Sequence, residues 1–247
     1  MDYTPKDKKA INRLERYPTR GRYDQETVFS ILDKGLVCHV GFTLPYAVSQ
    51  NGMPGQMEDW PMVIPMVYGR IEDTLYLHGH LSSRLLQHLS EDVFGDGQGP
   101  ATTITVTETN GLVLALSTFN HSLNYRSACC FGYARLVEDA DEKLVALKAI
   151  ANHAYLQVDG DRWSDTRTIK ESELASTRVV AVKIVQASAK VRQAPVGDDK
   201  SDVQDAEVTA KVWAGVVPLK TTYGEPQTMS YSTNVPIPEY VRKLRRL

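Results

Sequence analysis

Residues 111–134 read GLVLALSTFNHSLNYRSACCFGYA, two apolar runs separated by the polar cluster 121–127. The runs predict two strands, and the cluster is expected at a strand end or turn, where side chains can meet a ligand. Residues 124–127 supply an amide, an aromatic ring, a planar cation and a hydroxyl. Such a set suits a flat aromatic ligand with a phosphate, because Arg pairs with phosphate and Tyr packs on rings. A polar turn with an ordinary surface Arg is the alternative.

The composition is that of a globular chain of 247 residues, enough for one large domain or two small ones. Apolar residues make up 42%, and the net charge of −2 gives no global reason to expect nucleic acid or an anionic membrane as partner. The N-terminus lacks the apolar region of a signal peptide, and no apolar run has bilayer length. Three cysteines, two of them adjacent, make no disulfide framework, so we expect a reducing, cytoplasmic compartment.

Short apolar segments in hairpin order indicate the architecture. Strands are expected over 36–42, 61–68, 75–78, 127–138 and 178–185, and as a hairpin of 102–107 and 112–116 around Asn110-Gly111. Helices are expected over 25–34, capped by Asp24, and over 141–155. Many strands with few flanking helices favour a mainly β (α+β) fold, an antiparallel barrel. His39, inside the first strand, is expected to be a hydrogen-bonded core residue.

A second polar corner follows the strand 75–78. Residues 79–84 (GHLSSR) lead into a short helix that begins near Ser82. Free backbone N–H groups, hydroxyls and Arg84 at this helix start can bind phosphate, and a Ser N-cap beside a surface Arg is the alternative. His78 and His80 share a strand face, but no nearby carboxylate or cysteine completes a metal site, so no metal is predicted.

Peripheral segments flank a predicted domain of residues 25–220. Residues 1–24 are expected to form an arm over the fold. Its basic residues alternate with aromatic ones, and they either contact an anion or form solvated surface: Arg16, Tyr17, Arg20, Arg22 and Tyr23. The segment 194–207 is acidic and is expected to be an inserted loop. Residues 45–59 are expected to be a long hairpin loop, and residues 221–247 a basic tail.

Ordered blocks of residues 16–220 resemble the pyridoxamine 5′-phosphate oxidase-like flavin-nucleotide-binding family, in the branch that includes the nitroimidazole-resistance reductases. The matching blocks are Arg20–Asp24, Gly35–Phe42, Ile64–Tyr68, Leu75–His80, Leu112–Ala115, Asn124–Ser127, Phe131–Ala134, Glu142-Lys143 and Trp213–Leu219. The resemblance implies a split β-barrel that works as a homodimer, with FMN in clefts at the subunit interface. No counterpart of the residues that recognise pyridoxal phosphate is found, so vitamin B6 oxidation is not expected.

The resemblance also implies roles for individual residues. Ser82, Ser83 and Arg84 would hold the FMN phosphate. Pro65, Met66 and Val67 would pass under the isoalloxazine ring and offer it backbone groups. Tyr125, Arg126 and Ser127 would contact the ribityl–phosphate part, and Trp213 would close the cleft from the partner chain. His78 would contact substrate or deliver a proton, for which its pKa range is suited.

Three functions follow from these expectations. The first is an FMN-dependent oxidoreductase that acts on a small molecule with NADPH or NADH as electron donor. The second is a flavin-binding module without turnover, such as a carrier or sensor. The third is haem binding or degradation, in which a histidine would serve as axial ligand: His39, His78, His80 or His121.

Overall fold

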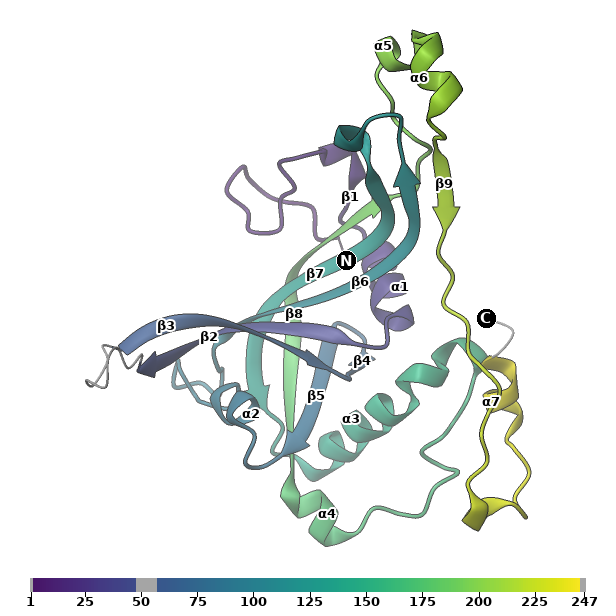
Figure 1. Ribbon diagram of the computed structural model, residues 1–247. Coiled ribbons are helices and arrows are strands. Elements are labelled where there is room, and N and C mark those ends of the chain that lie inside the picture. The colour runs from purple at the N-terminus through teal and green to yellow at the C-terminus, as the bar shows by residue number, and fades with distance from the viewer. Residues whose placement is uncertain (1, 48–56, 245–247) are drawn as a thin grey trace.

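The computed structural model of the chain describes residues 2–47 and 57–244, and Figure 1 shows its ribbon. These residues form one antiparallel sheet of nine strands, ordered β3-β2-β6-β7-β8-β5-β4, with β1 beside β8 and β9 beside β6. The strands are β1 (Gly21–Arg22), β2 (Cys38–Ala47), β3 (Met57–Met66), β4 (Gly69–Ile71), β5 (Thr74–His80), β6 (Ala101–Leu114), β7 (Ser122–Leu136), β8 (Thr177–Arg192) and β9 (Gly215–Pro218). Because β3 and β4 end this order unpaired with each other, the sheet curves without closing. The predicted split-barrel architecture is therefore confirmed.

Short helices flank the sheet, as predicted. They are α1 (Gln25–Lys34), α2 (Arg84–His88), α3 (Ala140–Asn152), α4 (Glu171–Ser176), α5 (Lys200–Gln204), α6 (Ala206–Lys211) and α7 (Glu239–Lys243), with 3-10 turns η1 (Pro18–Arg20), η2 (Thr118–Asn120), η3 (His153–Val158) and η4 (Ser230–Ser232). Asp24 caps α1, since its side chain accepts a hydrogen bond from the Thr27 N–H at 2.7 Å.

The main core lies on the concave side of the sheet. The α1 stripe of Val28, Ile31 and Leu32 is fully buried against inward-facing strand residues. Full burial of each such side chain stabilises the fold by about 1.5–3 kcal/mol. The inward set alternates with outward residues along β6, whose Ile104 and Val106 are buried. Residues 103, 105 and 107 therefore face away from the core.

A second, smaller core lies between α3 and the strands β4 and β5. Tyr76 packs there with Leu147 and Val179, and its hydroxyl donates to Glu142 Oε1 at 2.9 Å. His153 follows α3 and packs against the main core: its ring lies 4.3 Å from that of Tyr68, and its Nε2 is 2.7 Å from the Gly35 carbonyl oxygen. These contacts fix the strand β5, which carries His78, against the helical side.

One turn prediction is wrong. Asn110-Gly111 is not a hairpin turn, because β6 continues through it to Leu114 and only a register shift between Thr109 and Gly111 marks the place. Pairing with both β7 and β9 holds this segment extended, which overrides the local turn preference. The polar cluster 121–127 lies at a strand end, as expected: β7 begins at Ser122, and the turn before it is η2.

Two further expectations differ from the structure. His39 is exposed, because Cys38, Val40 and Phe42 take the inward positions of β2. The acidic segment 194–207, expected to be a loop, contains α5 and the start of α6. These two helices form the tip of the projection at the top of Figure 1. Of the predicted loop 45–59, residues 48–56 lie outside the described part of the chain.

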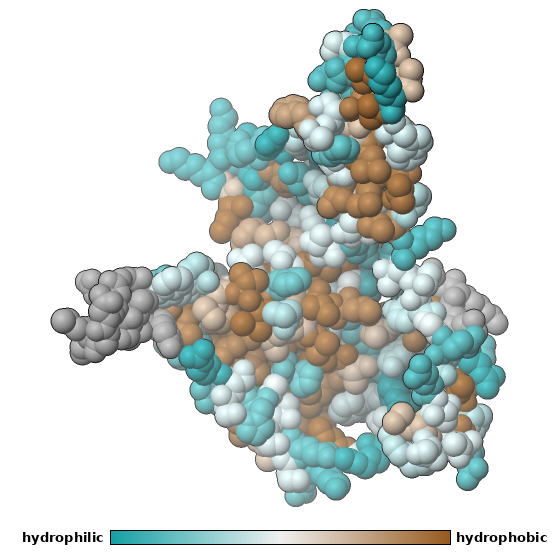
Figure 2. All heavy atoms as spheres, viewed as in Figure 1, coloured by the Kyte–Doolittle hydropathy of each residue, from teal (hydrophilic) through white to brown (hydrophobic). Residues whose placement is uncertain are grey.

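Apolar side chains gather on the face shown in Figure 2, over β2 and β3 and again along β9. The exposed large apolar residues include Val63 of β3 and Val217 of β9, and also Val67 and Leu219, which follow these strands, and Leu112 of β6, which pairs with Val217. Contiguous exposed apolar surface of this kind marks interaction sites more often than free surface. None of the helices in the described ranges combines the length and the apolar character that crossing a bilayer requires.

Candidate functional site

The outward side of the central strands is lined with hydroxyl groups. Thr105 of β6 pairs with Cys129 of β7, which pairs with Ser188 of β8, and Thr107 pairs in the same way with Ser127. Residues that pair directly share one side of a sheet. We call this surface the hydroxyl face, and it consists of Thr103, Thr105, Thr107, Ser127 and Ser188. Its side chains are half-buried or exposed, whereas Ile104, Val106, Ala128 and Cys130 behind it are buried.

On one side of the hydroxyl face lies β2, and beyond it the edge strand β3. His39 of β2 pairs with both Thr105 and Pro65, so Pro65 lies two strands away from Thr105 in the same row. Pro65 and Val67 are exposed, while Met66 packs against the main core. Within the described residues β3 pairs only with β2, which leaves one backbone edge of β3 available to a ligand.

On its other side the hydroxyl face ends in a positive charge. Lys190 of β8 pairs with Ser127 of β7 on one side and with Gly21 of β1 on the other. The described residues contain no carboxylate within ion-pair distance of Lys190. The hydroxyl face is therefore a strip of neutral hydrogen-bonding groups with an uncompensated cation at one end, which suits a polyol chain that ends in phosphate.

Arg126 does not lie with Ser127 on this face. Its guanidinium donates to Ser30 Oγ of α1 at 2.7 Å and lies 3.7 Å from Glu108 Oε2. Alternation along β7 places Tyr125 and Ser127 on the opposite side of the strand. The three residues predicted to act together are thus adjacent in sequence but divided between two faces.

The second predicted corner, at the end of β5, is assembled by local contacts. Ser83 caps α2 by accepting from the Leu86 N–H at 3.5 Å, and Ser82 lies beside His80, with its Oγ 2.8 Å from His80 Nδ1. Ser82 and Arg84 are exposed. Both the phosphate-binding role and the simple N-cap role are compatible with this geometry.

His78 lies near this corner, on β5. Burial lowers its pKa below the ordinary histidine value, so the ring is neutral at pH 7. Its Nδ1 is buried and has no hydrogen-bond partner among the described residues. An unpartnered buried ring nitrogen is uncommon in a folded interior, and His88 Nε2 and His153 Nδ1 are further cases in the described part of the chain.

Within one chain, the polar cluster 121–127 and the polar corner 79–84 lie far apart. His80 pairs with Thr177 at the start of β8, whereas Arg126 pairs with Val191 near its end. Fourteen residues of strand separate them, or about 45 Å along β8 at about 3.3 Å per residue. Ser82, Ser83 and Arg84 therefore do not meet Tyr125 and Ser127 of the same chain.

Trp213 lies just before β9 on the projecting segment. Its ring rests against Gly215, where an added Cβ would lie 2.6 Å from Trp213 Cζ2, so a small residue is required there. The indole is 65% exposed, which is unusual for the largest apolar side chain and leaves its ring available to another surface.

A cavity of about 850 Å³ lies elsewhere, between α3 and the segment 163–173. Its lining is partly apolar, with Leu144, Trp163 and Ile169, and partly charged, with Arg167 and Glu173. No residue predicted to bind a ligand lines this cavity, and it lies on the helical side of the protein.

The sequence-based prediction missed the three threonines and Lys190. The alternation in residues 102–107 (TTITVT) is the signal that could have identified them, since every second residue of a half-buried strand shares one face. The lateral pairing of Lys190 with Ser127 had no local signal, because 63 residues separate the two in sequence.

Comparisons with known proteins agree with this architecture. Residues 24–191 match the family described as pyridoxamine 5′-phosphate oxidase. The structure of flavocytochrome Anf3 from Azotobacter vinelandii is 31% identical, with TM-score 0.73 over 94% of this chain and 95% of its own. The FAD and heme binding protein from Mycobacterium smegmatis is 28% identical, with TM-score 0.72 over 92% of this chain and 97% of its own. Comparison with curated proteins gives no match. The chain belongs to the pyridoxamine 5′-phosphate oxidase family, as its ordered motifs indicated.

Proposed function

We propose that this protein is a flavin-dependent oxidoreductase that binds the FMN moiety of its flavin along the hydroxyl face. The observation that carries the proposal is the arrangement of an exposed edge strand, a row of hydroxyls and an uncompensated Lys190 across adjacent strands. The three parts of FMN match these features in the same order: the isoalloxazine ring matches the edge strand, the ribityl chain the hydroxyls, and the phosphate Lys190. The family and the names of the two similar structures support flavin as the ligand.

Each part of the FMN moiety has residues of suitable chemistry. Pro65, Met66 and Val67 would lie under the isoalloxazine and offer backbone groups from the free edge of β3. Tyr125 and Ser127 would contact the ribityl–phosphate part, with Lys190 beside them. A direct contact from Arg126 stays a prediction, since it requires the guanidinium to leave Ser30 and Glu108.

We further propose that the working unit is a homodimer. The two polar corners are too far apart to serve one phosphate within a chain, but a second copy can bring its Ser82, Ser83 and Arg84 to the hydroxyl face of the first. The exposed apolar surface along β3 and β9 supplies the area that such an interface needs (Figure 2). In that arrangement Trp213 is available to cover the partner's cleft.

Bound flavin would supply hydride or electron transfer, with NADPH or NADH as donor and a small molecule as acceptor. The protein's part is to position the ring and to control one proton. The neutral ring of His78, whose Nδ1 has no partner within the described chain, is the proposed group for substrate contact or proton transfer.

The test is the absorbance spectrum of the purified protein, recorded before and after anaerobic addition of NADPH or NADH. The proposal predicts flavin bands that bleach with a nicotinamide donor. Flavin bands that persist with both donors would support the flavin-binding module without turnover instead. A protein that neither carries flavin nor takes up added FMN would overturn both.

Haem binding is a second candidate, favoured by one observation. The two structures named a flavocytochrome and an FAD and heme binding protein match this chain over 92% or more of its length, beyond the segment 24–191 that defines the family. A Soret band in the same spectrum would support haem alongside flavin. Its absence, also after reconstitution with haemin, would exclude haem.

A further inference from the structure

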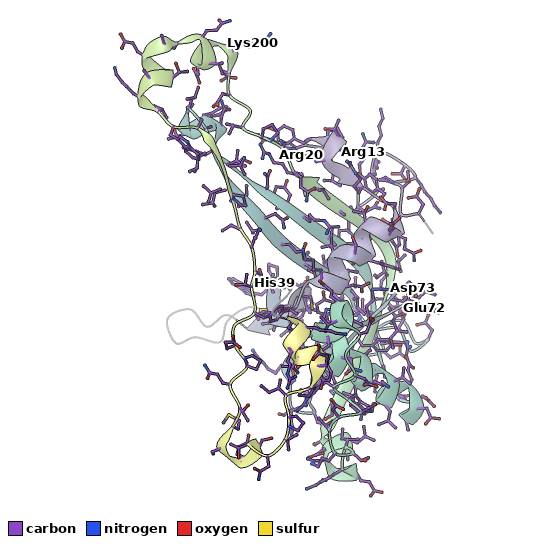
Figure 3. The ribbon with its side chains drawn as sticks, turned by 90° about the vertical axis from the view of Figure 1, so that its right-hand side faces the viewer. Arg13, Arg20, His39, Glu72, Asp73 and Lys200 are labelled. Carbon is purple, nitrogen blue, oxygen red and sulfur yellow. The ribbon has the colours of Figure 1, made fainter. Side chains whose placement is uncertain are left out.

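The N-terminal arm carries a compact group of cations on one aromatic ring. The guanidinium of Arg20 lies 4.1 Å from the centre of the Tyr17 ring, and that of Arg16 lies 5.2 Å from it. Both contacts are within the range of cation–π attraction. We call Arg16, Tyr17 and Arg20 the arm cluster. Figure 3 shows Arg20, together with Arg13, on the arm at the edge of the molecule.

The charge of the arm cluster is not balanced locally. Residues 2–24 contain seven Lys and Arg but four Asp and Glu. Arg13 pairs with Glu15 at 3.1 Å, whereas no ion pair within the described ranges includes Arg16 or Arg20. Two like charges held on one ring repel each other, and an anion between them removes that repulsion. This arrangement distinguishes the arm cluster from ordinary solvated basic surface.

The backbone at the arm cluster is held in an uncommon conformation. Tyr17 has φ 56 and ψ 60, in the left-handed region that residues other than glycine rarely adopt. The following turn η1 then places Arg20 back over the ring. Backbone strain of this kind is concentrated at ligand-binding sites, where the surrounding structure enforces it.

The arm cluster continues the hydroxyl face. Ser127 pairs with Lys190, Lys190 pairs with Gly21 of β1, and Gly21 directly follows η1. Arg16 lowers the pKa of the Tyr17 hydroxyl, and smaller contributions from Arg20 and Lys190 act in the same direction. Four strand spacings of about 4.8 Å separate Pro65 from the β8 end of the face, or about 19 Å. A ligand that starts at β3 and reaches Lys190 therefore meets the arm cluster next.

We propose that the arm cluster binds the adenosine diphosphate half of a flavin dinucleotide, with Arg16 and Arg20 on the second phosphate and Tyr17 against the adenine. The inference rests on the proposed function, since it extends the flavin site along the same face of the sheet. It assigns FAD rather than FMN as the preferred flavin. Lys190 lies at the junction and contributes to binding of both.

The experiment compares FAD and FMN affinities of the flavin-free protein and of the double variant Arg16→Ala/Arg20→Ala by fluorescence titration. Losing two charge-assisted contacts is expected to lower FAD affinity by at least about 10-fold. FMN affinity is expected to change less than about twofold, because FMN lacks the second phosphate. Arg13→Ala is the matched control: it removes a cation from the same arm, but one that Glu15 already neutralises. Both variants change only exposed or half-buried arm residues, and their thermal unfolding is compared with that of the parent.

Each outcome decides the inference. A loss confined to FAD in the double variant supports it. Equal losses for FAD and FMN, no loss for either, or the same FAD loss in Arg13→Ala would overturn it. If the parent binds no flavin, the proposed function fails, and ADP alone becomes the probe. ADP binding by the parent that the double variant lacks still supports the arm cluster as a nucleotide site, and no ADP binding by the parent refutes it.

Discussion

Lys190→Ala is expected to weaken binding of FMN and FAD alike. Lys190 is half-buried beside Ser127 and has no carboxylate partner within the described chain, so its charge is free to pair with a ligand phosphate. A hydrogen bond to a charged group contributes about 1.5–3 kcal/mol, and each 1.36 kcal/mol is a factor of ten. The dissociation constant should therefore rise by about 10- to 150-fold. Because the site is partly open to solvent, the difference should shrink as salt is added.

The assay is titration of flavin-free protein with FMN, followed by quenching of flavin fluorescence at low and high salt. Lys183→Ala is the matched control, since Lys183 lies on the same strand but its side chain is 72% exposed and faces Asp73 at 3.9 Å. Circular dichroism establishes that both variants are folded. An FMN affinity within twofold of the parent for Lys190→Ala, or an equal loss for Lys183→Ala, would refute the placement of the phosphate.

Three other outcomes follow from the structure. His78→Ala should leave flavin bound but lower turnover with NADPH, and equal rates in variant and parent would reduce His78 to a structural residue. Burial lowers the pKa of His153 in the folded chain. Below about pH 6.5 this histidine therefore binds a proton more readily in the unfolded chain than in the folded one, and the free energy of unfolding falls as the pH falls. In urea unfolding, the free energy of unfolding should decrease less between pH 8 and pH 5.5 for His153→Gln than for the parent. An equal decrease in both proteins would contradict this role of His153. Gly132→Ala should destabilise the fold by about 3 kcal/mol through overpacking, because its Cβ would lie 2.1 Å from the Lys183 carbonyl oxygen. Gly197→Ala, with nothing within 4 Å of the new Cβ, should unfold like the parent.

Local patterns predicted most of the elements but not their pairing. The α1 helix was predicted at its observed bounds, because Asp24 and the Val28, Ile31, Leu32 stripe are short-range signals. Asn110-Gly111 misled the interpretation, since cross-strand pairing on both sides of β6 is a long-range effect that local turn chemistry does not report. His39 was assigned to the core because its strand was apolar overall, although the alternation of Cys38, Val40 and Phe42 placed it outside.

The candidate site could be predicted only in part, for the same reason. Tyr125, Arg126 and Ser127 are adjacent polar residues in the sequence. The pleat of β7 nevertheless places Arg126 on the side of the sheet that faces α1. Lys190 and the arm residues 16–20 join Ser127 only through the register of β8 with β7 and β1. The distance between the two polar corners likewise follows from the length of β8, which the sequence pattern underestimated: the strand was predicted over 178–185 and runs over Thr177–Arg192.

The most direct measurement is a crystal structure of the protein grown with FMN or FAD. The proposal predicts flavin density across Thr105 and Ser127, with the ring at Pro65–Val67 and phosphate beside Lys190. Density in the cavity between α3 and residues 163–173 would contradict it, and so would flavin that touches neither Ser127 nor Lys190.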